Sequence, residues 1–171
     1  MFKSPKTLVR SVPALGAALA MGFVLASCGG GTVNTQKAES LLKQKVAAQT
    51  GVSIASVSCP SSVPAKKGGT FVCTAHGIDG THAPVSVTQT DANGNVSYSA
   101  NLVKSGYVQT RIIAELQTKF KIAVNSVRCP AVMEYVDGSQ FTCQLTANNG
   151  STAKAIVSLQ AGGAFSFKLS R

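Results

Sequence analysis

The chain has 171 residues, 16 Lys and Arg against 6 Asp and Glu, and a formal net charge of +10. This length allows one ordinary domain or two small ones. Only 13% of the residues are charged, the longest basic run is Lys66–Lys67, and aromatic and basic residues do not alternate, so the sequence does not indicate a nucleic-acid-binding protein.

The N-terminal segment has the organisation of an export signal. A short basic stretch, Met1 to Arg10, precedes a run of apolar or small residues from Val12 to Ala26. A membrane-spanning helix needs about 20 apolar residues, which is more than this run provides. Because a basic segment followed by a short apolar one is typical of a signal peptide, we expect residues 1–27 to be one.

The end of this segment, Leu25-Ala26-Ser27-Cys28, resembles a bacterial lipobox. The resemblance implies that a diacylglyceryl group is attached to the Cys28 thiol and that the signal is cleaved between Ser27 and Cys28. In the alternative, an ordinary secreted protein, Cys28 would be free or paired. The odd count of five cysteines argues against this alternative, because the other four pair within the repeats described below.

Residues 28–34 are then expected to be the lipidated cysteine and a Gly-rich tether. Two acyl chains, of the palmitate type, hold a protein firmly on a bilayer, whereas one binds reversibly. The predicted location is therefore the extracytoplasmic face of the cell membrane.

The first folded element is a predicted helix from about residue 36 to residue 50. Asn34 or Thr35 is the expected cap and Gly51 the expected end. Apolar residues at helical spacing, Ala38, Leu42 and Val46, predict the buried face. Four strands are expected to follow, at about residues 54–59, 70–78, 81–90 and 96–100.

The same pattern returns 70 residues later. Cys59-Pro60 matches Cys129-Pro130, and the Gly, Phe and Cys of the next motif match at the same offset. The second copy predicts a helix over about residues 107–120. Its stripe comprises Val108, Ile112, Ile113 and Leu116. Its strands are expected at about residues 124–129, 140–148, 151–160 and 165–169. The sequence thus predicts an α+β fold with two tandem repeats, residues 35–103 and 104–171, each one helix on a four-stranded antiparallel meander.

The paired cysteines of each repeat are 14 residues apart on neighbouring predicted strands. In an exported chain they favour two structural disulfides, Cys59–Cys73 and Cys129–Cys143. A metal site would need more ligands than two cysteines per repeat, and redox catalysis usually uses a Cys-x-x-Cys motif, which is absent.

The residues that could carry chemistry are few. The two histidines, His76 and His82, flank Asp79-Gly80, which is interpreted as a two-residue hairpin turn. In that register the imidazoles point to opposite faces, which disfavours a metal site. No pair of carboxylates recurs between the copies, and there is no Gly-x-Ser-x-Gly, phosphate-binding or dinucleotide-binding motif. We expect no catalytic residue, no metal and no cofactor.

The order of motifs resembles an uncharacterised domain family of actinobacterial, notably mycobacterial, envelope proteins. Each copy has Val-x-Cys-Pro, then Gly-x-x-Phe-x-Cys, then a Gly turn and Val-x-Val. The motif residues are Val57, Cys59, Pro60, Gly68 or Gly69, Phe71, Cys73, Gly80 and Val87 in copy one, and Val127, Cys129, Pro130, Gly138, Phe141, Cys143, Gly150 and Val157 in copy two. The second copy departs from the pattern at Lys121, where a glycine would end the helix. The resemblance implies a fold and a location but no activity.

Three functions remain open at this point. The first is a non-enzymatic tethered module that binds or scaffolds another envelope component: a protein, glycan or lipid. The second is a carrier that holds a lipid or small apolar ligand between helix and sheet. The third, a hydrolase, is disfavoured by the missing motifs. Charge favours copy two as the binding unit for an anionic partner, because it has 8 basic and 3 acidic residues, whereas copy one has 5 and 3.

Overall fold

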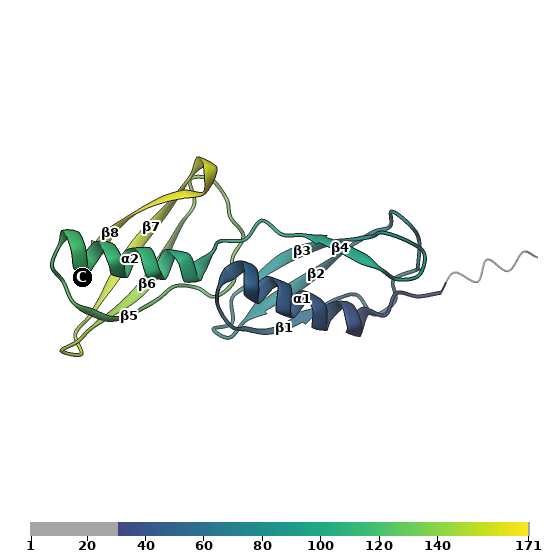
Figure 1. Cartoon of the computed structure of the whole chain (residues 1–171), viewed down its shortest axis with the longest axis horizontal. Coiled ribbons are helices and arrows are strands. Elements are labelled where there is room, and N and C mark those ends of the chain that lie inside the picture. The colour runs from purple at the N-terminus through teal and green to yellow at the C-terminus, as the bar shows by residue number, and fades with distance from the viewer. Residues whose placement is uncertain (1–30, 171) are drawn as a thin grey trace, which may run out of the picture.

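The computed structural model describes residues 31–170, which form two α+β repeats arranged end to end (Figure 1). The predicted fold class is confirmed, with two helices, two four-stranded antiparallel sheets and two disulfides. The molecule is elongated, and the described chain begins at the outer end of the first repeat and ends at the outer end of the second.

The elements follow the same order in both repeats. The first repeat comprises α1 (Thr35–Thr50), β1 (Ile54–Ser58), β2 (Thr70–Gly77), β3 (His82–Gln89) and β4 (Val96–Ser99). The second comprises α2 (Ser105–Lys119), β5 (Val124–Arg128), β6 (Gln140–Ala147), β7 (Thr152–Gln160), a short 3-10 turn (Ala161–Gly163) and β8 (Ala164–Ser170).

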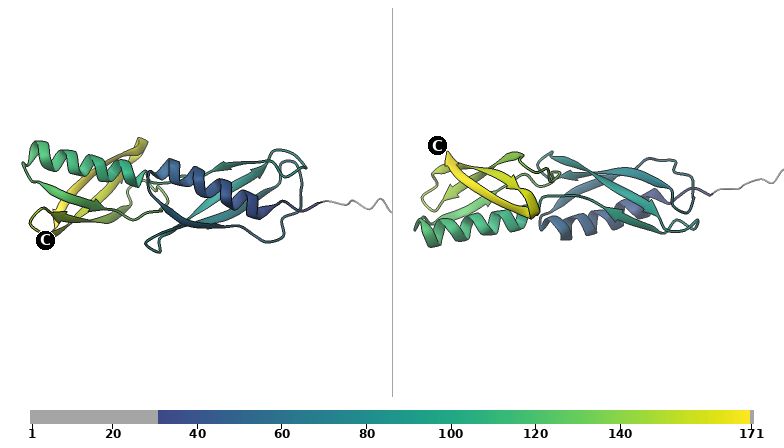
Figure 2. Two further views of the ribbon diagram at one scale, coloured as in Figure 1. Left: turned by 60° about the horizontal axis from the view of Figure 1, so that its bottom comes forward. Right: turned by 90° about the horizontal axis from the view of Figure 1, so that it is seen from above.

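Each repeat has two layers, a helix and an antiparallel sheet whose strands follow chain order. Alternate strand residues face the helix and form a core with its apolar stripe. The core of the second repeat contains Val108, Ile112 and Leu116 of α2, as predicted, and Phe165 and Phe167 pack against it. In Figure 2, right, both helices lie along one side of the molecule. The opposite face of each sheet carries no helix in residues 31–170.

The two helices begin and end differently. The side chain of Asn34 caps α1 by accepting a hydrogen bond of 2.9 Å from the Lys37 amide, and Gly51 ends it with a φ of 71°. At the start of α2, Lys104 makes no capping hydrogen bond. Lys121, at the position equivalent to Gly51, has a φ of 57°, a left-handed conformation that favours glycine.

The prediction of a two-residue hairpin turn at Asp79-Gly80 is wrong. The Gly77 amide donates to the Thr81 carbonyl, which encloses a three-residue loop, and only Gly80 in this loop has a positive φ. His76 therefore pairs directly with His82, and both imidazoles lie on the outer face of the first sheet with ring centroids 6.4 Å apart. The extra residue in the loop reverses the side on which one histidine was expected.

Both predicted disulfides are present. Cys59 bonds to Cys73, and Cys129 bonds to Cys143. In each repeat the second cysteine is fully buried in the core. The Glu39 carboxylate of α1 also accepts a hydrogen bond of 2.8 Å from the Cys59 amide, which ties the helix to the bridge.

The hairpin loop between β2 and β3 of the first repeat forms hydrogen bonds with the second repeat. The Asp79 carboxylate accepts a 2.8 Å hydrogen bond from the Ala131 amide, and the Thr81 hydroxyl accepts one of 3.0 Å from the Val132 amide. Partial burial would raise the pKa of Asp79, but hydrogen bonds from the Thr81 hydroxyl and from the Ala131 and Thr81 amides outweigh it, so the pKa lies below its usual value.

Apolar packing and backbone contact complete this junction. Ala131 and Val132 belong to the second repeat in sequence but are buried in the core of the first. Gly106 of α2 lies directly against the backbone of Gly51, since a Cβ at Gly106 would be 2.6 Å from the Gly51 carbonyl oxygen. The two repeats therefore meet as closely packed bodies.

Candidate functional site

The residues predicted for anchoring, Ser27 and Cys28, lie outside the described residues. The four other cysteines are all used in disulfides. Within residues 31–170, no group of three or more His, Cys, Asp or Glu side chains is placed to hold a metal ion. Over the same residues, no helix is long and apolar enough to cross a bilayer.

The outer face of the second sheet carries three exposed cations. Arg128 on β5 and Lys154 on β7 both pair through Gln144 on the strand between them, and Lys168 on β8 pairs with Ile156, two residues along β7. Neighbouring strands lie about 4.8 Å apart, so Arg128 and Lys154 are about 10 Å apart across the sheet, and Lys168 lies on the edge strand beyond Lys154 on the same face. We call Arg128, Lys154 and Lys168 the cationic face.

This face contains no acidic residue. The carboxylates of the second repeat lie elsewhere, and Glu115 on α2 is paired with Arg111 and Lys119. Asp79 of the first repeat lines the same hollow as Arg128, but its oxygens accept hydrogen bonds from Ala131 and Thr81. No ion pair reaches the cationic face from anywhere in residues 31–170.

The strand residues on the equivalent face of the first repeat include no Lys, Arg, Asp or Glu. Ser58, Pro84 and Ser99 occupy the positions of the three cations. The two sheets have the same strand order, so the cations are not required by the fold. The sequence showed that the second copy has a higher positive charge than the first. Part of this difference lies on one exposed surface, the cationic face.

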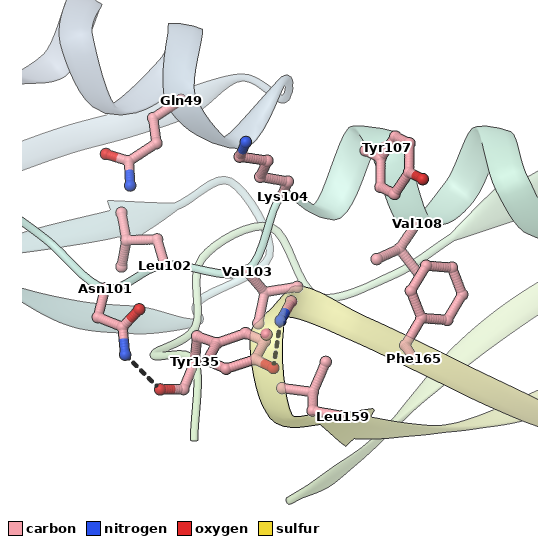
Figure 3. Close-up of a pocket in the computed structure, with 12 residues that line it drawn as sticks. Gln49, Asn101, Leu102, Val103, Lys104, Tyr107, Val108, Tyr135, Leu159 and Phe165 are labelled. Atoms are coloured by element: carbon pink, nitrogen blue, oxygen red, sulfur yellow. Dashed lines mark hydrogen bonds between the residues drawn. The ribbon is translucent and has the colours of Figure 1, made fainter. Parts of the chain in front are cut away.

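A groove lies where the two repeats meet, and its volume is about 460 Å³. We call it the junction groove. Figure 3 shows Gln49 and Asn101 on one side, Tyr107 and Phe165 on the other, and Tyr135 between them. Both repeats contribute side chains, and the groove residues are Gln49, Asn101, Leu102, Val103, Lys104, Tyr107, Val108, Tyr135, Leu159, Gly162, Gly163 and Phe165.

The walls of the groove are held by hydrogen bonds and aromatic packing. The side-chain amide of Asn101 donates to the Tyr135 backbone carbonyl at 2.8 Å. The Tyr135 hydroxyl accepts from the Gly163 backbone amide at 3.1 Å and donates to the Gln160 carbonyl. Burial raises the pKa of Tyr135, the Gly163 amide opposes this, and the nearby Asp137 carboxylate raises the pKa further. Tyr107 and Phe165 meet edge to face with centroids 6.3 Å apart.

Sequence reasoning missed the groove, although one signal was available. Its aromatic residues occur only in the second repeat, because Lys37, Ala65 and Val96 stand at the positions of Tyr107, Tyr135 and Phe165. A search for aromatic residues present in one copy and absent from the other, in addition to residues shared by both, would have identified these three positions.

A comparison with protein families accounts for the repeat. The model described as Domain of unknown function (DUF4333) matches residues 18–94 and 99–161. The chain belongs to this family. Each matched segment of the DUF4333 protein includes one helix and the first three strands of one repeat, so the duplicated unit is the family's domain. No curated protein and no solved structure matches the chain.

Proposed function

We propose that this protein is a non-enzymatic, lipid-anchored cell-envelope protein, of the kind found in actinobacteria, whose second repeat binds an anionic envelope component. The cationic face is the observation that carries the proposal. Three exposed cations that have no carboxylate partner within residues 31–170 attract anions, since unpaired charges on a low-dielectric surface raise the local concentration of counterions. The partner is another component of the envelope, either anionic lipid headgroups or an acidic polymer.

A non-enzymatic role is supported by the surroundings of the titratable groups. His76 and His82 are the residues best suited to general acid–base catalysis near neutral pH. Neither forms a side-chain hydrogen bond to a hydroxyl, thiol or carboxylate in the described chain, so no activated nucleophile or oriented base is assembled around them.

The proposed anchor is Cys28, three residues before the first described residue, Gly31. The described chain begins at the outer end of the first repeat (Figure 1), so a lipid at Cys28 would put the cationic face in the membrane-distal repeat. In that placement the lipid headgroups proposed as partner would belong to a surface other than the anchoring bilayer. Cys28→Ala is expected to accumulate uncleaved precursor. The wild-type chain should begin at Cys28 and carry a lipid mass there, and an unmodified mature N-terminus at any other residue would refute the anchor.

The binding proposal is tested with the chain from Gly31 onwards, so that membrane insertion does not mask surface binding. Phosphatidylglycerol vesicles and soluble polyglutamate are two arms that distinguish a lipid partner from a polymer. Each basic residue near an anionic surface contributes about 1 kcal/mol, so changing Arg128, Lys154 and Lys168 to Gln should weaken binding roughly 100-fold.

A matched control removes the same charge from the first repeat. Lys45, Lys66 and Lys67 are exposed, and changing all three to Gln gives the same net charge as the first variant. Binding by this control should stay close to wild type and weaken with salt. Equal losses in both variants, or binding indifferent to salt, would contradict the proposal.

The alternative function, a carrier of a lipid or small apolar ligand, is supported by the junction groove and not by the space between helix and sheet. The space between each helix and its sheet is occupied by buried side chains, including Leu42, Val46, Ile112 and Leu116. A bound apolar ligand would therefore lie in the junction groove rather than between helix and sheet.

A further inference from the structure

The junction groove is built from both repeats and is larger and more apolar than its counterpart. The first repeat has a hollow at the equivalent position, about 310 Å³ in volume, between the start of α1 and the β3–β4 turn. Its residues include Lys37, Asn93, Asn95 and Val96. The hollow is therefore a feature of the fold, and the aromatic walls are a feature of the second repeat alone.

The aromatic walls are accessible. Tyr107 is 56% exposed, and it lines the groove together with Phe165, which it meets edge to face. A volume of about 460 Å³ falls within the range of sites that hold small organic molecules, which are mostly apolar with a few polar groups. A ligand with a ring or a short acyl body fits these walls.

The charge of the groove selects among such ligands. Lys104 is the sole charged residue among those that line it, and no carboxylate pairs with Lys104 within residues 31–170. Its equivalent in the first repeat, Asn34, caps a helix, which stabilises a protein by about 1 kcal/mol. The second repeat lacks this cap and has a cation at the groove instead, a local sacrifice of stability that is typical of functional positions.

We propose that the junction groove binds a small amphipathic anion, with an apolar ring or short acyl body against Tyr107 and Phe165 and one acidic group near Lys104. This site is separate from the cationic face, and the inference does not depend on binding there.

Two probes with the same apolar body separate the contributions of charge and packing. 8-Anilinonaphthalene-1-sulfonate is anionic, and N-phenyl-1-naphthylamine is its neutral counterpart. The full chain is held in phosphatidylcholine vesicles, and the fluorescence of protein-free vesicles is subtracted. We expect saturable binding of one anionic probe per chain, and weaker binding of the neutral probe.

Variants then assign the site. Lys104→Gln should lower the affinity for the anionic probe by up to about fivefold, the range for a partly exposed ion pair. The affinity for the neutral probe should stay unchanged. Tyr107→Ala, at an exposed position that the core does not need, should weaken both probes by up to about tenfold. Lys37→Gln, the matched charge removal in the first repeat, should change neither.

Three results would overturn the inference. The first is no saturable binding of either probe. The second is equal affinity for the two probes in the wild-type chain. The third is a loss on Lys37→Gln as large as that on Lys104→Gln, which would assign the effect to overall charge. Loss of binding to the cationic face leaves all of these measurements unaffected, so the two proposals fail separately.

Discussion

Replacing Gly106 by alanine should destabilise the protein, although the same change in a helix usually stabilises it. Alanine is favoured over glycine in a helix by up to about 1 kcal/mol. At Gly106, however, the new Cβ would lie 2.6 Å from the carbonyl oxygen, 3.0 Å from the carbonyl carbon and 3.2 Å from the Cα of Gly51. These are backbone atoms and cannot rotate away, so the two repeats must separate slightly.

Overpacking of this kind costs about 1–3 kcal/mol, and we expect a net loss of about 1–2 kcal/mol after the gain in helix propensity. Urea denaturation of the oxidised chain measures it. The control is Gln36→Ala, at the equivalent exposed position of α1, which should change stability by less than about 0.5 kcal/mol. Stability equal to or above wild type in Gly106→Ala would refute the close contact between the repeats.

Three further predictions concern stability. Lys121→Gly should raise the free energy of unfolding by about 1 kcal/mol, because the residue has a positive φ; a loss would contradict the left-handed conformation. Asp79→Asn should lower the free energy of unfolding by about 1 kcal/mol at neutral pH, since it weakens a partly buried hydrogen bond from the Ala131 amide. Because the folded-state pKa of Asp79 is lowered, this stability is present above the unfolded-state pKa and lost as the pH falls through the folded-state value, so wild type and variant should converge in acid. Changing Cys129 and Cys143 together to Ala should lower the free energy of unfolding by about 2–5 kcal/mol. A non-reducing peptide map of the wild-type chain should show the pairs Cys59–Cys73 and Cys129–Cys143.

The repeat made most of the fold predictable from sequence. Matching cysteines, glycines and apolar residues at one offset predicted the order of elements, and helical spacing predicted the buried face of each helix. The hairpin was misassigned because a glycine with positive φ occurs both in two-residue turns and in three-residue loops. Asp79-Gly80 therefore cannot specify the loop length, and with it the side on which His76 lies.

The junction and its groove were beyond the reach of that reasoning. Asp79 bonds to Ala131, 52 residues away, and the second repeat has no such contact, because nothing follows it in residues 31–170. Comparing the two repeats in the sequence therefore could not reveal this contact, because it occurs once. The cationic face was predictable as a charge excess, but only the register brings Arg128, Lys154 and Lys168 together.

Transfer of the cations to the first repeat tests the central claim most directly. The starting chain has Arg128, Lys154 and Lys168 changed to Gln. Its first repeat then receives the substitutions Ser58→Arg, Pro84→Lys and Ser99→Lys at the equivalent positions, which restores the net charge. The affinity for the anionic partner identified in the vesicle and polyglutamate assay is then measured. Recovery to within about threefold of wild type is predicted, because the two sheets have the same strand order and register and each cation contributes about 1 kcal/mol wherever it faces the partner. Affinity that stays at the level of the Gln variant would contradict the account and show that binding needs more from the second repeat than its exposed charge.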